Sequence, residues 1–247
     1  MVGPAAIIGG RAGVITSAGD SLQIRLFGRG AHGSMPQASI DPVVMAAATV
    51  MRLQTIVSRE LAAAEAAVVT IGSLQAGTKE NVIPDEALIK LNVRSFDEGV
   101  RQRVLAAIDR IVNAGAAASG APRPPEITPL DRYPLVVNDP AASQRVADAF
   151  RRHFPAERVR ETGPAPASED FGSFGAEWHA PSVFWRVLAT ALSLAGVADG
   201  RRWSVRILGE LGARRRASEE PRGGPSSARG GHYSATCARS AAIRAGA

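Results

Sequence analysis

The sequence predicts an α/β protein whose largest unit is a β-α-β-β-α-β sandwich, with a four-stranded antiparallel sheet and two helices on one face. Apolar and polar residues alternate in several short stretches, which indicates strands, and apolar residues recur at helical spacing in two longer ones. The order of these stretches between residues 20 and 131 gives the sandwich. Shorter patterns after residue 131 indicate pieces of a second α/β domain.

The strands follow from period-two alternation. In residues 20–28, Leu22, Ile24 and Leu26 alternate with polar residues, which indicates a half-buried strand. Three further segments are predicted as strands of the same sheet: 67–74, 86–96 and 124–131. In the third strand the apolar side chains share one parity and Arg94 lies on the other. One sheet face and one edge then need cover, so a dimer is plausible.

The helices follow from capping residues and apolar spacing. Asp41 is the expected N-cap of a helix through residue 59, with Pro42 at its first position. Its predicted apolar positions are Val43, Ala46, Ala47, Val50, Leu53, Ile56 and Val57. A second helix, 98–118, is built on Val100, Val104, Ile108 and Ile111. A third runs from residue 140 to Phe154, with Val146, Phe150 and Phe154 on its buried side, and residues 181–185 are predicted as a short strand. Residues 1–15 show little periodicity.

The charge is unevenly distributed. The chain of 247 residues has a formal net charge of +6, which at first indicates a nucleic-acid binder. From residue 186 onward there are 11 Arg against 4 acids, whereas the preceding 185 residues carry 18 basic and 19 acidic groups. The basic character therefore belongs to the C-terminal tail, and nucleic-acid binding by the folded part is not expected.

The tail itself, from residue 188 or so onward, is expected to be disordered, since after residue 213 it is Arg, Ser, Gly, Ala and Pro without apolar period. It could be an RNA- or phosphate-binding arm, but we favour an out-of-frame reading of GC-rich DNA. The single cysteine, Cys237, allows no internal disulfide, which fits a cytoplasmic protein. No secretory leader is visible and no apolar run approaches the roughly 18 residues of a membrane span, so no membrane association is expected.

Few residues carry a chemical signal. His32 lies between glycines in a turn-rich loop and could donate a hydrogen bond to an oxyanion. Asn81 and Arg94 flank a predicted hairpin and could grip a carboxylate, the guanidinium in bidentate fashion. A surface histidine, a turn asparagine and a solvated arginine are the plain alternatives. The pair Glu169 and Asp170 could serve metal or acid–base chemistry, or cap a helix.

Other signals are excluded or missing. Residues 28–33 match G-x-G-x-x-G after a strand, but Pro36 follows where a dinucleotide site needs a helix, and Leu53 stands near the place of its acid. The sequence shows no C-x-x-C, H-E-x-x-H, G-x-S-x-G or P-loop motif.

Taken together, the motifs resemble the amidohydrolase branch of metallopeptidase family M20, which includes hippurate hydrolases, N-acyl-amino-acid amidohydrolases and auxin–amino-acid conjugate hydrolases. The resemblance covers about residues 1–185 and rests on these runs: 28–36 (GRGAHGSMP), 41–44 (DPVV), 53–59 (LQTIVSR), 81–86 (NVIPDE), 93–97 (VRSFD) and 168–171 (SEDF).

The resemblance implies a catalytic α/β domain with two divalent metal ions, zinc or manganese, and a smaller inserted lid that forms the homodimer. Residues 17–131 then correspond to the lid, 1–16 and 132–187 to parts of the catalytic domain, and 188–247 to the tail. By motif match His32 steadies the oxyanion in the partner's site, while Asn81 and Arg94 hold the carboxylate of an N-acyl amino acid such as hippurate.

The family's metal-binding motifs find no match here, so no metal ligand is assigned. We therefore expect a chain truncated at its N-terminus that binds no metal and is catalytically incomplete. The alternative is a non-catalytic homodimerisation or substrate-binding module. The acyl group and the amino acid of the substrate are not specified by the sequence.

Overall fold

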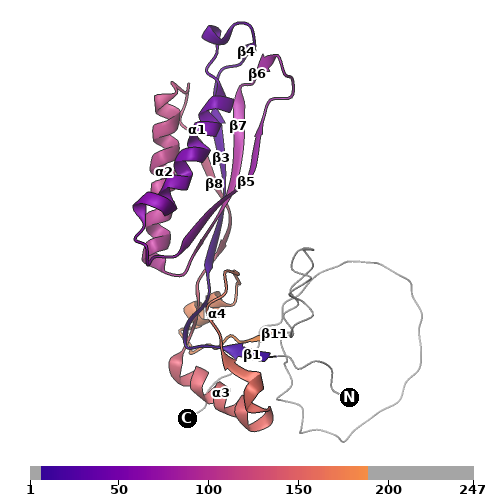
Figure 1. The fold of residues 1–247 in the computed structure, drawn as a ribbon. Helices are drawn as coiled ribbons and strands as arrows, with labels where there is room; N and C mark the ends of the chain where they lie inside the picture. The colour runs from indigo at the N-terminus through magenta and orange to yellow at the C-terminus, as the bar shows by residue number, and fades with distance from the viewer. Residues whose placement is uncertain (1–6, 189–247) are drawn as a thin grey trace, which may run out of the picture.

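The computed structural model describes residues 7–188 and shows a long sandwich standing on a smaller base (Figure 1). The sandwich contains β3 (Ala18–Phe27), α1 (Pro42–Thr55), β5 (Ala67–Ala76), β7 (Glu86–Ser95), α2 (Glu98–Ala118) and β8 (Glu126–Tyr133). This β-α-β-β-α-β order confirms the prediction from the sequence. The predicted tail, Cys237 and residues 1–6 lie outside the described residues.

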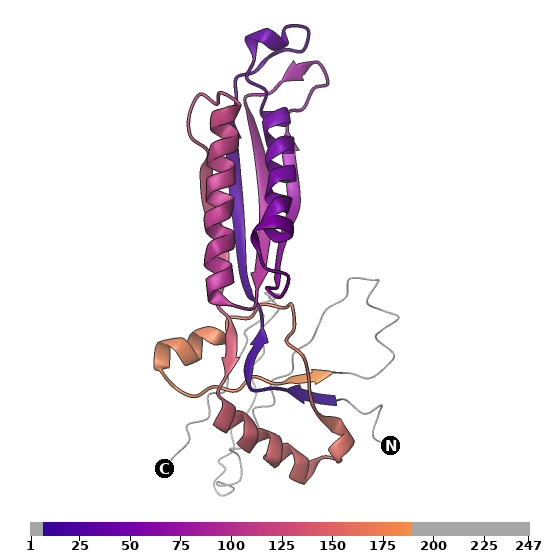
Figure 2. The same ribbon diagram turned by 60° about the vertical axis from the view of Figure 1, so that its left-hand side comes forward.

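The sheet of the sandwich is antiparallel, in the order β5-β7-β3-β8. Both helices cover one face, α1 over β5 and β7 and α2 over β7 and β3 (Figure 2). Ala87, Ile89, Leu91 and Val93 are buried toward the helices, as the predicted parity requires. Arg94 therefore lies on the open face of the sheet.

Helix α1 begins where the sequence predicts, because the Asp41 carboxylate accepts hydrogen bonds from the backbone N–H of Val43 and Val44. Its buried face differs from the prediction. Met45, Ala46, Thr49, Leu53 and Ile56 face the core, at intervals of three, four and seven residues. Val43, Ala47 and Val57 were expected inside and are exposed, because apolar residues occur all round this helix and spacing alone could not choose the face.

Helix α2 matches the predicted bounds, and Asp97 caps it by accepting from the N–H of Val100. All four predicted core residues of the helix are buried. The core of the sandwich is made of Leu, Ile, Val, Ala and one Met from both helices and the sheet.

The base is built from segments on both sides of the sandwich. Strand β1 (Ile7–Gly10) pairs in parallel with β10 (Val159–Glu161) and antiparallel with β11 (Arg186–Leu188). Strand β2 (Gly13–Thr16) pairs with β9 (Val136–Asn138). The base also contains the helices α3 (Pro140–His153) and α4 (Gly172–Trp178) and a short 3-10 turn, η3 (Ala156–Arg158). Outside the base, a 3-10 turn η1 (Pro36–Ala38) lies at the tip of the sandwich, and a π-turn η2 (Ile56–Glu60) follows α1.

Three predictions for the base need correction. Residues 181–185 have no strand geometry, and the strand begins at Arg186 instead. Residues 7–16, which lack alternation, form β1 and β2, because their pairing partners lie some 120 to 180 residues away and local pattern does not register them. Phe154 caps α3 and is 39% exposed, since the helix ends one residue before it.

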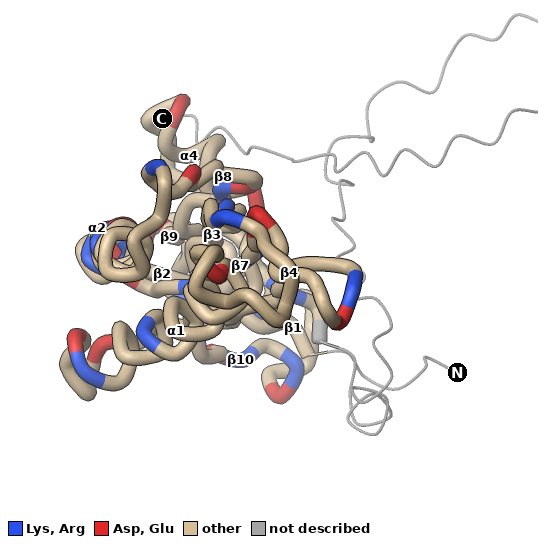
Figure 3. The backbone as a smooth tube through the Cα atoms, turned by 90° about the horizontal axis from the view of Figure 1, so that it is seen from above, with Lys and Arg blue, Asp and Glu red and all other residues tan. Residues whose placement is uncertain are grey.

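The charges of the described part balance. Residues 7–188 contain 19 basic and 19 acidic side chains, and basic and acidic positions are interspersed along the chain (Figure 3). Within these residues, no helix has the length and apolar character that a membrane crossing requires.

Candidate functional site

His32 and Asn81 come together at the tip of the sandwich. A two-residue strand β4 (Ala31–His32) pairs with β6 (Val82–Ile83), with His32 opposite Val82. The backbone N–H of Gly33 donates to the Asn81 carbonyl at 2.8 Å. The imidazole and the carboxamide thus belong to neighbouring positions of one small ribbon, and both residues are exposed.

The ribbon is held by close backbone contacts that need glycine. The N–H of Gly30 donates to Asp85 Oδ1 at 2.7 Å, and a Cβ on Gly30 would lie 2.7 Å from the Ile83 carbonyl oxygen. Gly28 donates to the Asp85 carbonyl, and a Cβ there would overlap the Ile40 carbonyl. The glycines of the G-x-G-x-x-G run therefore serve a tight loop and not a phosphate.

The hydrogen bonds of His32 fix its tautomer. The backbone N–H of Ser34 can only donate, and it lies 3.3 Å from His32 Nδ1; the Ser34 hydroxyl lies 2.7 Å from the same atom. Nδ1 therefore accepts, and the proton of the neutral ring is on Nε2. The ring thus presents an N–H donor at the tip, which is the group that an oxyanion requires.

Arg94 lies at the opposite end of the same sheet. It is eight residues from Glu86 along β7, and Glu86 stands beside the tip, so at about 3.3 Å per residue the separation is roughly 26 Å. The sequence led us to expect Asn81 and Arg94 as one clamp with His32. Within a single chain the structure brings His32 and Asn81 together and leaves Arg94 apart, because the hairpin strands β5 and β7 each run for ten residues.

Arg94 contacts a loop of the base. Its Nη1 donates to the Pro166 carbonyl at 3.0 Å and to the Ser168 hydroxyl at 2.9 Å. Within the described residues the other edge of the guanidinium, Nε and Nη2, has no hydrogen-bond partner. That edge carries two parallel N–H groups, the arrangement that binds a carboxylate in bidentate fashion.

Glu169 and Asp170 follow Ser168 in this loop. Partial burial raises the pKa of Glu169 above its ordinary value, and the neighbouring negative charge of Asp170 raises it further. A partly buried carboxyl of raised pKa is a candidate for proton exchange. His179 ends α4 in a left-handed conformation (φ 48°), which indicates a role in the turn.

Sequence reasoning missed two residues that shape these groups. Asp85 holds the Gly30 backbone, and Ser168 holds Arg94. Both lie inside runs that carry the family resemblance, but their partners are distant in sequence, so only the fold shows their contacts.

The described residues do not form a metal centre. Between residues 7 and 188 no three His, Cys, Asp or Glu side chains come close enough to hold an ion. The two metal ions implied by the resemblance therefore find no ligand set among these residues, and we derive no step through them.

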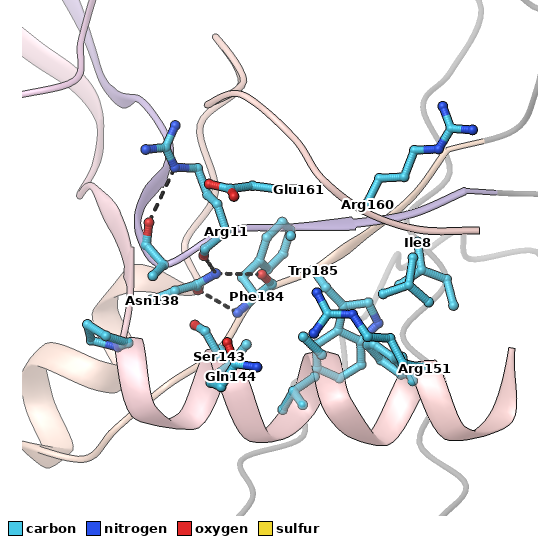
Figure 4. Close-up of a pocket in the computed structure, with 18 residues that line it drawn as sticks. Ile8, Arg11, Asn138, Ser143, Gln144, Arg151, Arg160, Glu161, Phe184 and Trp185 are labelled. Carbon is cyan, nitrogen blue, oxygen red and sulfur yellow. Dashed lines mark hydrogen bonds between the residues drawn. The ribbon is translucent and has the colours of Figure 1, made fainter. Parts of the chain in front are cut away.

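The base contains a cavity of about 190 Å³ beside α3, lined by apolar side chains, by Asn138, Ser143 and Gln144, and by the charged Arg11, Arg151, Arg160 and Glu161 (Figure 4). Asn138 is fully used there, since its side chain bonds the backbone of Arg11 and Phe184. None of His32, Asn81 or Arg94 lines this cavity, so it is separate from the candidate site.

The sandwich and its tip ribbon define a dimerisation-type domain, and the comparisons agree. Residues 19–119 match the family described as the peptidase dimerisation domain. The chain is 35% identical over 182 residues to an N-acetyldiaminopimelate deacetylase of Limosilactobacillus fermentum, which covers 72% of this chain and 46% of that protein. It is 34% identical over 163 residues to a hippurate hydrolase of Campylobacter jejuni, covering 66% of this chain and 42% of that protein.

A solved structure shares the fold. A Bacillus subtilis protein, described as a dinuclear metal-binding peptidase of the M20 family, superposes with a TM-score of 0.55 at 28% identity, over 72% of this chain and 43% of that one. The chain belongs to the M20 amidohydrolase family. It spans less than half the length of these relatives.

Proposed function

We propose that the chain supplies the dimerisation domain and the substrate-gripping groups of a metal-dependent amidohydrolase that cleaves the amide bond of N-acyl amino acids. In this proposal residues 17–131 act as a lid, residues 132–187 belong to the catalytic domain, and the site is completed by a second copy. The observation that carries it is the separation of Arg94 at the base from His32 and Asn81 at the tip. These groups can meet only if one copy's tip reaches another copy's base.

The β5 edge of the sheet suits self-association. The opposite edge strand, β8, contains Pro129, Asp131 and Arg132, which are residues that protect an edge from pairing. Strand β5 has neither proline nor charge, and its Val68 and Leu74 are 48% and 47% exposed. An unpaired apolar edge of ten residues is a ready template for a second copy.

Helix α1 lies over the same edge and has an apolar outer face. Val44 is 65% and Met51 71% exposed, and Ala47 lies between them at helical spacing. The exposed side chains of α2 instead include Gln102, Arg103, Asp109, Arg110 and Asn113, of which Arg103 pairs with Glu65 and Arg110 with Glu60. The apolar helix face and the free strand edge therefore occur together on one side of the sandwich.

The geometry of such a dimer puts tip against base. A two-fold axis perpendicular to the sheet pairs the two β5 strands antiparallel and keeps both α1 helices on the same face, where their apolar surfaces meet. Ala76, at the tip end of one β5, then lies beside Ala67, at the base end of the other. The β4–β6 ribbon extends beyond β5 (Figure 1) and reaches toward the partner's Arg94 and its loop.

Each group then has a defined task. The free edge of Arg94 binds the carboxylate of the N-acyl amino acid in bidentate fashion, and the Asn81 amide of the partner adds a neutral hydrogen bond. The Nε2–H of the partner's His32 donates to the oxygen that becomes negative when the amide carbonyl is attacked.

Ligand binding tests the proposal. Isothermal titration with hippurate (N-benzoylglycine) should show binding to the chain that Arg94→Ala abolishes and Arg94→Lys weakens, because lysine lacks the bidentate fork. His32→Ala should leave hippurate binding unchanged but weaken binding of an analogue whose amide carbonyl is replaced by a tetrahedral phosphonate. Equal binding of hippurate by the wild type and Arg94→Ala would refute the assigned role.

Turnover is a separate question. We expect no hydrolysis of hippurate or N-acetyl amino acids by the pure chain with added zinc or manganese, since none of the motifs that it shares with the family is a metal-binding motif. Measurable hydrolysis would show that the chain is a complete enzyme. Hippurate binding without hydrolysis would favour the alternative hypothesis, in which the chain is a non-catalytic substrate-binding and dimerisation module.

A further inference from the structure

Arg94 sits at a junction where a loop of the base is pressed against the open face of the sandwich sheet. Gly19 on β3 is the direct neighbour of Arg94 on β7 and of Tyr133 on β8. These three positions share the open face, because Ala18 and Asp20 point to the other side. Between the two larger side chains, Gly19 leaves a gap in the sheet surface.

Ser168 fills that gap. A Cβ on Gly19 would overlap the Ser168 hydroxyl and lie 2.9 Å from Ser168 Cβ, whereas Tyr133 Cδ2 would be at an ordinary 3.8 Å. Gly19 has no positive φ, so its backbone does not require glycine. The absence of a side chain is needed only for Ser168 to approach.

The loop is tied to the chain before β3 by the residues that precede Ser168. The N–H of Ser17 donates to the Ala165 carbonyl at 3.1 Å, and its hydroxyl donates to the Ala167 carbonyl at 3.0 Å. Ala165 in turn donates to Ile15 at 2.9 Å. These hydrogen bonds of the preceding residues hold Ser168 in place, so its hydroxyl is available to accept a hydrogen bond from another side chain.

We propose that Ser168, seated in the gap at Gly19, is a positioning residue for Arg94. With the Pro166 carbonyl it occupies both N–H groups of Nη1, which fixes the plane of the guanidinium and leaves the Nε–Nη2 edge without a partner among the described residues. The carboxylate site is thus preorganised by the base loop, and the sandwich and base are coupled through the same arginine. This inference rests on the proposed role of Arg94 in carboxylate binding.

Two variants and a control test it in the full chain. Ser168→Ala removes the acceptor, and Gly19→Ala displaces Ser168 while leaving it intact. Gly10→Ala is the control, because Gly10 lies in strand β1 of the base and an added Cβ would meet only Trp185 Cβ at an ordinary 3.9 Å. The first readout is the ¹⁵Nε–¹H NMR cross-peak of Arg94, assigned by its loss in Arg94→Lys.

The second readout is affinity for hippurate compared with its carboxamide, N-benzoylglycinamide. We expect both variants to shift or broaden the Arg94 cross-peak and to weaken hippurate binding roughly tenfold, the scale of one hydrogen bond to a charged group, with no loss for the carboxamide.

An Arg94 cross-peak unchanged in both variants would overturn the inference. So would an equal loss of affinity for hippurate and for the carboxamide, which marks general structural damage. If the wild type binds no hippurate while the cross-peak still moves in both variants and not in Gly10→Ala, the positioning contact stands and the proposed function falls.

Discussion

Arg101 is the largest side chain that the described part of the chain buries completely, at 2% exposure. Its Nε and Nη2 bind both oxygens of Asp20 at 2.7 and 2.5 Å, and its Nη1 binds Glu98. No sequence pattern paired Arg101 with Asp20, which lies 81 residues earlier. Removing one partner of such a buried ion pair leaves the other charge uncompensated, which destabilises the folded chain.

Replacing Asp20 by Ala should therefore destabilise the chain strongly, by about 3–5 kcal/mol, because it leaves a buried guanidinium without its counter-charge. Urea unfolding followed by circular dichroism measures the change. Glu65→Gln is the control, since it breaks the exposed ion pair with Arg103 and should change stability little. Similar losses in the two variants would contradict the description of Asp20 and Arg101 as a buried pair.

The raised pKa of Glu169 predicts that the stability of the chain depends on pH. Because burial and Asp170 raise its pKa in the folded state, the folded chain binds more protons than the unfolded chain between the ordinary and the raised value. The stabilisation is present below this window and is lost as pH rises through it. The Glu169→Gln variant cannot ionise at this position, so it does not lose this stabilisation as pH rises. The free energy of unfolding of the variant, relative to the wild type, should therefore increase from pH 4 to pH 7.

Urea unfolding of both proteins at several pH values in that range measures the effect. Glu177→Gln, which removes an exposed carboxylate from α4, controls for net charge. A difference between Glu169→Gln and wild type that stays constant with pH would show that Glu169 titrates alike in the folded and unfolded chain.

At the level of elements, the sequence predicts best where a local rule is strong. Caps and alternation gave the start of α1, the bounds of α2 and the parity of β7. The buried face of α1 was predicted only in part: Ala46, Leu53 and Ile56 are buried as expected, whereas other predicted positions are exposed because this helix is apolar on both sides. The exposed apolar side then became the argument for a dimer. The β4–β6 ribbon was missed because two-residue strands have no period to detect.

Asp97 offers a direct test of the capping rule. Its carboxylate satisfies the Val100 N–H at 2.9 Å at the start of the 21-residue helix α2. Asp97→Ala should lower the free energy of unfolding by about 1 kcal/mol, and Asp97→Ser should restore most of it, because serine is also a good N-cap. Chemical denaturation of the wild type and the two variants measures these free energies of unfolding. Equal stability of the alanine and serine variants would contradict the capping role.

For the whole molecule, the sequence predicted the sandwich but not the placement of the site groups along it. Residue types and motif matches selected His32, Asn81 and Arg94, whereas only the register of β7 with β5 and β3 shows that Arg94 stands at the far end. Because Arg94 is separated from His32 and Asn81 by the length of a strand, we propose a site between two copies in place of the clamp within one chain that the sequence predicted.

The proposed interface makes its own prediction. Ala47→Glu places a charge in the apolar outer face of α1 and should shift the chain toward monomer in sedimentation velocity. Ala106→Glu makes the same change at an exposed alanine on the polar face of α2 and should leave association unchanged. If both variants associate like the wild type, the α1 face is not the interface.

The central claim is that one copy's tip and another's base form the carboxylate site, and a mixing experiment tests it most directly. Asn81→Ala and Arg94→Ala each damage one half of the site, and each alone should bind hippurate poorly. Unfolded together and refolded as an equal mixture, half of the dimers should contain one of each, with one intact pair of Asn81 and Arg94, so about a quarter of the wild-type sites should return. Calorimetry that finds these restored sites supports assembly between copies; a mixture that binds no better than its separate components contradicts it.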